Sequence, residues 1–205
     1  MRATRQIRRI PTSFPARIEP APIPPGWPLL LGGICVASVV LVQQIVQTRV
    51  GRPLDHAMLG RVLDLVGGAT GTAQMVLSAT TNLSVLAALV VLIAVAVLRQ
   101  RPDLAVAAAA IVLGSSATTA IIKAVLGGSL PSGHVTAAAG LACAAVVVAS
   151  RWLRPLIVVL GVTATAIQAT STMILGWHLP SDVAAAGLVA VGWTALVHVT
   201  ARISR

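Results

Sequence analysis

Stretches of mostly apolar residues dominate this chain of 205 residues, and charged residues fall mainly between them. A helix needs roughly 20 apolar residues to cross about 30 Å of hydrocarbon. The stretches lie at about 28–46, 75–98, 104–126, 134–150, 155–175 and 182–200. The sequence therefore predicts an all-α, polytopic membrane protein with six transmembrane helices.

The composition excludes an ordinary soluble domain and argues against a nucleic-acid partner. Only 10% of the residues are charged, whereas soluble domains average about 25%. The net charge is +10, but nucleic-acid binding by a basic face also calls for aromatic side chains on which bases stack. Aromatic residues make up 2% of the chain and Tyr is absent. We expect membrane lipids as partners and no nucleic acid.

The positions of the arginines predict the orientation in the cell membrane. Most of them lie in the N-terminal tail, in the loops after the second and fourth predicted spans, and at the C-terminus. The opposite side carries only Arg49, Arg52, Arg61 and Lys123. By the positive-inside rule, both termini are cytoplasmic.

The chain divides into a membrane domain and its flanking segments. Residues 1–27 form a basic, Pro-rich cytoplasmic tail, residues 28–201 the membrane domain and residues 202–205 a short cytoplasmic tail. Within the domain, residues 47–73 form the longest extracytoplasmic segment, where apolar residues recur at helical spacing and predict an interfacial helix. The excess of Arg over Lys and the many Ala and Val residues favour a bacterial source.

Four ionisable residues fall at the ends of predicted spans on one face of the membrane. Lys123 ends the third span, His134 opens the fourth, His178 follows the fifth and Asp182 opens the sixth. All four therefore lie at one depth, on the extracytoplasmic side. Ionisable residues at the membrane are costly and indicate a functional site.

The turn at 130–134 precedes a predicted helix and suits an anion. The free N–H groups and positive dipole end of a helix bind groups such as phosphate. Gly133 lets the backbone approach closely, the Ser132 hydroxyl can donate a hydrogen bond, and Lys123 can add a full positive charge.

The second motif has the spacing of an oriented nucleophile. His178 precedes Asp182 by four residues, so the carboxylate can accept from one ring nitrogen and orient the other for attack. His134 can then protonate a leaving oxygen.

These residues resemble those of a known family. Pro131-Ser132-Gly133-His134 resembles the second signature of the type 2 phosphatidic acid phosphatase superfamily, which includes lipid phosphatases and vanadium haloperoxidases. Gly176-Trp177-His178-Leu179-Pro180-Ser181-Asp182 is similar to the end of its third signature, S-R-x-x-x-x-x-H-x-x-x-D. With six predicted spans, the resemblance covers most of the chain.

The resemblance implies an integral-membrane lipid-phosphate phosphatase that needs no metal or other cofactor. His178 is then the nucleophile that forms a phosphohistidine, Asp182 its orienting partner and His134 the general acid. Lys123, Ser132 and Gly133 would bind the phosphate. The implied substrates are phosphatidic acid, phosphatidylglycerol phosphate and the polyprenyl phosphates or diphosphates used in cell-envelope synthesis.

The chain departs from the family pattern at both signature arginines. Leu130 stands at the arginine position of the first signature and Thr172 at that of the third. Thr172 can donate one neutral hydrogen bond to the substrate, and Leu130 cannot. Losing one preorganised donor costs about 10²–10³ in rate. Arg49, Arg52 and Arg61 are the extracytoplasmic arginines that can replace the missing charge.

Two alternatives stay open beside the phosphatase. The missing arginines favour a catalytically impaired member that binds or carries lipid phosphate or supports a partner complex. Metal-dependent hydrolysis through His134, His178 and Asp182 is the other; it predicts loss of activity with chelator. Haloperoxidase activity fits least, since vanadate binding also uses such arginines.

Overall fold

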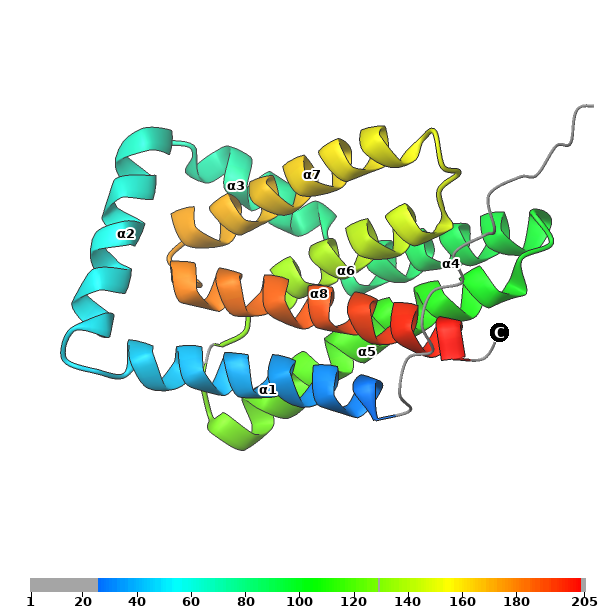
Figure 1. Ribbon diagram of the computed structural model, residues 1–205. Coiled ribbons are helices and arrows are strands. Elements are labelled where there is room, and N and C mark those ends of the chain that lie inside the picture. The colour runs from blue at the N-terminus through cyan, green and yellow to red at the C-terminus, as the bar shows by residue number, and fades with distance from the viewer. Residues whose placement is uncertain (1–25, 129, 204–205) are drawn as a thin grey trace, which may run out of the picture.

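The computed structural model describes residues 26–128 and 130–203, and these residues form helices and short connections (Figure 1). The helices are α1 (Trp27–Val46), α2 (Gly51–Val66), α3 (Thr70–Ala79), α4 (Asn82–Leu98), α5 (Pro102–Leu126), α6 (Gly133–Val148), α7 (Arg154–Ile174) and α8 (Pro180–Ile203). The prediction of an all-α protein is confirmed for the described residues. The predicted tail at 1–27 lies outside them except for its last two residues, as do the last two residues of the predicted tail at 202–205.

Helix α6 lies at the centre of the bundle. It packs against α4, α5, α7 and α8, while α1 packs on α8 and α3 on α7. A core cluster joins α4, α5 and α6 through residues such as Leu89, Ile111 and Ala144. Gly140 permits the close approach of α5, because a Cβ there would lie 2.9 Å from Ser115 Oγ. The central position of α6 brings the residues of its first turn into the interior.

Three helices, α5, α7 and α8, are long and apolar enough to cross a membrane. Two bent pairs, α1 with α2 (92°) and α3 with α4 (55°), raise the number of candidate spans to five if each pair counts as one. The chain is thus a multi-pass membrane protein, with fewer unbroken spans than the six predicted. Helix α6 has 16 residues, short of the roughly 20 that cross the hydrocarbon.

The predicted span at 75–98 is broken because two threonines make polar contacts inside the apolar run. The Thr80 hydroxyl donates to Gln168 Oε1 of α7 (3.1 Å). Thr81 caps α4, accepting from the Ser84 N–H (3.2 Å). Thr and Ser commonly cap helices in this way, so a new helix begins at Asn82.

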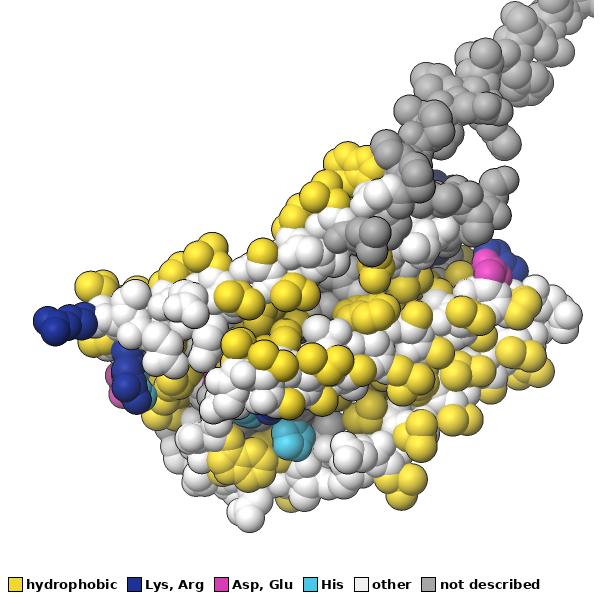
Figure 2. Space-filling view, turned by 90° about the horizontal axis from the view of Figure 1, so that it is seen from below, with side chains coloured by type: hydrophobic (Ala, Val, Ile, Leu, Met, Phe, Trp, Pro, Cys, Tyr) yellow, Lys and Arg dark blue, Asp and Glu magenta, His cyan; other side chains and the backbone are white. Residues whose placement is uncertain are grey.

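The surface agrees with a membrane setting. In Figure 2 the Lys and Arg side chains gather mainly at two opposite ends of the molecule, and hydrophobic side chains cover much of the face between them. Large apolar side chains are exposed on several helices, among them Val106, Ile121 and Val159. So wide an apolar surface is unusual for a soluble monomer and fits contact with lipid.

One end of the bundle collects the ends of four helices, and we call it the site end. Helices α5 and α7 finish there, and α6 and α8 begin there (Figure 1). Gly127 ends α5 in the left-handed conformation (φ +65°), and its N–H donates to the Lys123 carbonyl. Helix α2 crosses the same end, at 92° to α1.

Candidate active site

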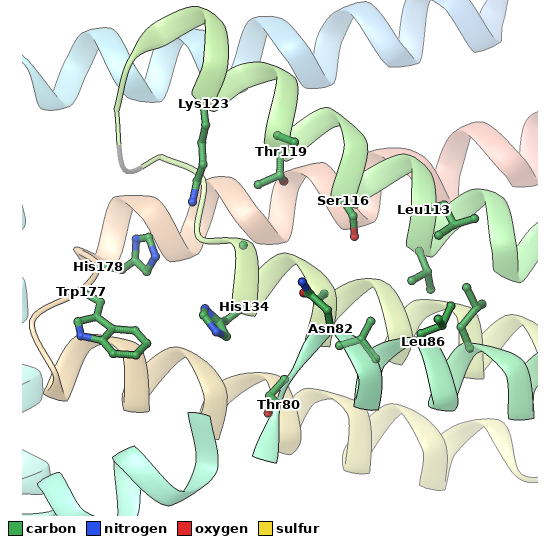
Figure 3. A pocket seen from close by; sticks show the side chains of 16 residues that line it. Thr80, Asn82, Leu86, Leu113, Ser116, Thr119, Lys123, His134, Trp177 and His178 are labelled. Atoms are coloured by element: carbon green, nitrogen blue, oxygen red, sulfur yellow. The ribbon is translucent and has the colours of Figure 1, made fainter. Parts of the chain in front are cut away.

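A cavity of about 600 Å³ extends from the site end between α4, α5 and α6 (Figure 3). Its polar end is lined by Lys123, Gly133, His134, Trp177 and His178. Farther along α4 and α5 the lining becomes mainly apolar: Val85, Leu86, Leu89, Val112 and Leu113. The cavity therefore joins a group of ionisable side chains to a hydrocarbon-like wall.

The α7–α8 loop holds His178 in a fixed orientation. Its Nδ1 lies 3.0 Å from Asp182 Oδ2, and the same oxygen accepts from the Leu179 N–H (3.1 Å). Asp182 is almost fully buried, with 3% of its surface exposed. Because Asp182 holds Nδ1, Nε2 is the ring nitrogen left for chemistry in the cavity.

The turn before α6 is bonded to the first turn of α8. The Ser132 N–H donates to the Asp182 carbonyl oxygen (3.1 Å). Ser132 is fully buried, and its hydroxyl has no hydrogen-bond partner among the described residues. No side chain described in the structure caps α6, so the N–H groups of its first turn stay available to an anion.

Lys123 and His134 face the cavity from either side of this turn (Figure 3). A Cβ on Gly133 would lie 3.9 Å from Lys123 Nζ, so the ammonium group is close to the start of α6. The His134 ring lies beside Trp177, with 5.8 Å between ring centroids and a tilt of 45°. One cation and two imidazoles thus surround the polar end.

Ser132, Thr172 and Asp182 are the predicted site residues that do not line the main cavity, and Leu130 at the first arginine position does not line it either. Thr172 is fully buried, does not line the cavity, and donates its hydroxyl to the Ala169 carbonyl (2.7 Å). Leu130 is 3% exposed and packs against Val39, Ile122, Ala185 and Val189. Both positions that carry arginine in the family pattern therefore hold packed side chains.

Within residues 26–128 and 130–203, no arginine lines the main cavity. Arg49 and Arg52 line a hollow at the corner between α1 and α2. Arg52 also lines a smaller pocket of about 190 Å³ that reaches Ser181 and Asp182 but shares no residue with the main cavity. Arg61 is exposed on α2. Lys123 is the cation of the cavity lining.

Several cavity residues were not predicted as site residues. Asn82, Ser116 and Thr119 line the cavity, as does Thr80 at the α3–α4 break. Ser116, Thr119 and Lys123 recur at i, i+3 and i+7, a spacing that places them on one face of α5 and marks a polar stripe. In the described part of the chain, no three His, Cys, Asp or Glu side chains group closely enough to hold a metal ion.

The comparison with known families agrees with this geometry. Residues 74–204 match the family model described as PAP2 superfamily. The chain belongs to the PAP2 superfamily. The resemblance drawn from the two motifs is confirmed, and every residue lining the main cavity lies within the PAP2 match, whereas α1 and α2 precede it. No curated protein and no solved structure matches the chain. Membership of the PAP2 superfamily is consistent with phosphatase activity on a phosphate ester.

Proposed function

We propose that this PAP2 protein is an integral-membrane lipid-phosphate phosphatase that works through a phosphohistidine intermediate. The observation that carries the proposal is the His178 ring, held at Nδ1 by Asp182 in a cavity that also contains Lys123 and His134. An imidazole oriented by a carboxylate, beside a cation and a second imidazole, is suited to nucleophilic attack on phosphorus.

In the first step, His178 Nε2 attacks phosphorus and the bond to the lipid oxygen breaks. The Nδ1–H donates to Asp182, which stabilises the positive charge that develops on the ring. Protonated His134 gives its proton to the departing lipid oxygen, so the lipid leaves as an alcohol, or as a monophosphate from a diphosphate.

In the second step, water attacks the phosphohistidine. Neutral His134 accepts a proton from this water, the P–N bond breaks, and inorganic phosphate is released with His178 restored. Each histidine ends the cycle in its starting protonation state.

Phosphate binding falls to Lys123 and the first turn of α6. The uncapped N–H groups favour an anion through the helix dipole, and Gly133 adds no side chain between them and the ammonium of Lys123. The Ser132 hydroxyl lies next to this turn without a partner among the described residues, but it is buried outside the cavity lining and would have to turn toward the phosphate to donate. Thr172, which the sequence suggests as a further ligand, would have to release the Ala169 carbonyl to reach phosphate.

The apolar half of the cavity favours a lipid as the substrate. From Lys123 to Leu113 the lining follows α5 for about 15 Å, about half the thickness of the hydrocarbon core. We assign phosphatidic acid, phosphatidylglycerol phosphate or a polyprenyl phosphate or diphosphate to this site. We also infer six spans, with the α3–α4 pair as one, cytoplasmic termini and an extracytoplasmic site end.

The test is phosphate release by the purified protein in detergent, with chelator present, on a panel of these lipids. We expect release with at least one lipid and none with His178→Ala. His198→Ala is the matched control, since His198 lies about 24 Å along α8 from Asp182. Release that survives in His178→Ala would contradict the phosphohistidine mechanism, and release that chelator abolishes would favour the metal-dependent alternative.

The second candidate is a PAP2 member that binds or carries lipid phosphate without turnover, or supports a partner complex. The absence of arginine from the described cavity lining favours it. Binding of a lipid phosphate by both the intact protein and His178→Ala, with no release by either, would establish this function in place of the phosphatase.

A further inference from the structure

Helix α2 lies outside the PAP2 match yet contacts the first turn of α8 through a buried carboxylate. Asp55 is 5% exposed, although its neighbours Leu54 and His56 are exposed. Burying a carboxylate is costly unless hydrogen bonds compensate. Both donors come from one residue 126 positions away: the Ser181 N–H gives a bond of 3.0 Å to Oδ1, and the Ser181 hydroxyl bonds to Oδ2.

These bonds fill a gap at the start of α8. An N-cap side chain normally accepts an N–H of the first turn, but Leu179 precedes α8 and has no acceptor in its side chain. Asp182 satisfies the Leu179 N–H from within the helix, like the third helical residue of a capping box. Asp55 supplies the missing half, because its carboxylate accepts the Ser181 N–H from α2.

The same first turn carries the group that orients His178. Asp182 follows Ser181 directly, and its Oδ2 accepts from both His178 Nδ1 and the Leu179 N–H. The position of this turn therefore sets where the Asp182 carboxylate lies, and with it the direction of the His178 ring. A negative charge at the N-terminus of a helix also stabilises that terminus.

We propose that Asp55 is a positioning residue for the His178–Asp182 pair: α2 caps α8 through Asp55 and so fixes the first turn that orients the nucleophile. The effect of Asp55 on turnover rests on the proposed phosphatase activity. Displacement of a reacting group by about 1 Å can cost about 10² in rate, so a remote cap can have a large effect on turnover.

The kinetic test compares variants of the full-length protein in detergent. Asp55→Ala removes both acceptors, and we expect kcat per folded molecule to fall about 10- to 100-fold with a smaller change in KM, because Lys123 binds the phosphate from α5. Asp55→Asn should recover most of the loss, since its carbonyl accepts the Ser181 N–H while its amide can donate to the Ser181 hydroxyl. Ser181→Ala, which removes one of the two bonds, should give a smaller fall in kcat.

Asp64→Ala is the matched control, since Asp64 is an exposed carboxylate on the same helix. We expect wild-type kcat from it. Wild-type kcat per folded molecule in Asp55→Ala would overturn the proposal, as would a loss that only follows the folded fraction. If Asp55→Ala does not fold, kcat of Ser181→Ala decides in its place.

A second measurement separates this inference from the proposed function. In protein labelled with ¹⁵N-histidine, the His178 ring resonances are assigned by their loss in His178→Ala. If the intact protein releases no phosphate, the phosphatase proposal fails and these resonances decide the role of Asp55. Altered Nδ1 shifts in Asp55→Ala would then support positioning, and shifts equal to those of the intact protein would overturn it.

Discussion

The two sides of the polar cavity end differ in how their polar groups are held. On the nucleophile side, the Asp182 carboxylate accepts two hydrogen bonds and Asp55 caps the turn behind it. On the phosphate side, neither the Lys123 ammonium nor the Ser132 hydroxyl has a hydrogen-bond or ion-pair partner within the described part of the chain. The nucleophile side is therefore held by hydrogen bonds within the protein, whereas the phosphate side has hydrogen-bond donors that an anion can use.

This difference indicates a division of labour within the site. A catalytic group held by neighbouring bonds needs no reorganisation at the moment of reaction. Donors without partners carry a desolvation cost that a bound anion removes. The nucleophile therefore depends on the fold alone, whereas the phosphate side depends on the anion that completes it. Leu130 and Thr172, at the two arginine positions of the family pattern, are buried and supply neither a charge nor a hydrogen-bond donor to the cavity.

The largest effect is expected from breaking the organised side. Asp182→Ala removes the acceptor of His178 Nδ1 and should lower kcat by about 10⁴-fold, as loss of the orienting carboxylate does in catalytic triads. Phosphate release per folded molecule measures it, with Asp64→Ala as the control. A fall of less than tenfold would mean that the ring is oriented by something other than Asp182.

Placing the arginine of the family's first signature at position 130 should lower the stability of the protein. Leu130→Arg places a cation in a packed apolar cluster, and an uncompensated buried charge destabilises by about 3–5 kcal/mol. Unfolding in detergent measures the loss. Leu126→Arg is the control, since Leu126 is more exposed at the end of α5 and a long basic side chain can reach the interface there.

A Leu130→Arg variant with unchanged stability and higher turnover would contradict the packing argument. It would mean that a side chain at position 130 can reach the phosphate. The phosphate side would then have a second cation available within the fold.

Much of this architecture follows from the sequence because apolar runs fix where helices lie. The runs place Lys123, His134 and His178 at helix ends, and alternation of direction brings those ends together. The segment at 47–73 contains α2 as a helix, while its position in the membrane interface stays a prediction. The break before α4 could have been predicted from Thr81, because threonine in an otherwise apolar run is suited to capping a helix.

Other features depend on contacts between distant parts of the chain. The hydrogen bond from Ser181 to Asp55 joins residues 126 positions apart, and no local sequence pattern predicts it. The burial of Leu130 arises from its packing against residues of α1, α5 and α8. The sequence alone identifies the missing arginines but not that their positions point away from the cavity.

The phosphate side can be tested through its cation, Lys123. Lys123→Ala should lower kcat/KM by about 10²–10³, the cost of removing a donor aimed at developing charge. Lys123→Arg keeps the charge and should retain part of the activity, although its planar group binds phosphate with a different geometry. Steady-state kinetics on the preferred lipid measures both. Equal kcat/KM in Lys123→Ala and the intact protein would remove Lys123 from the phosphate site.

The smallest effect is expected at Ser132, where stability and substrate binding should move in opposite directions. Its hydroxyl is buried without a partner among the described residues, so Ser132→Ala removes an unsatisfied group and should raise stability by about 1 kcal/mol. The variant also loses a donor to phosphate, so KM should rise about tenfold, the lower end of the effect of one charge-assisted hydrogen bond. Unfolding and steady-state kinetics on the same preparation measure the two changes. A fall in stability would mean that the hydroxyl already has a partner in the empty protein, and the phosphate side would then be as organised as the nucleophile side.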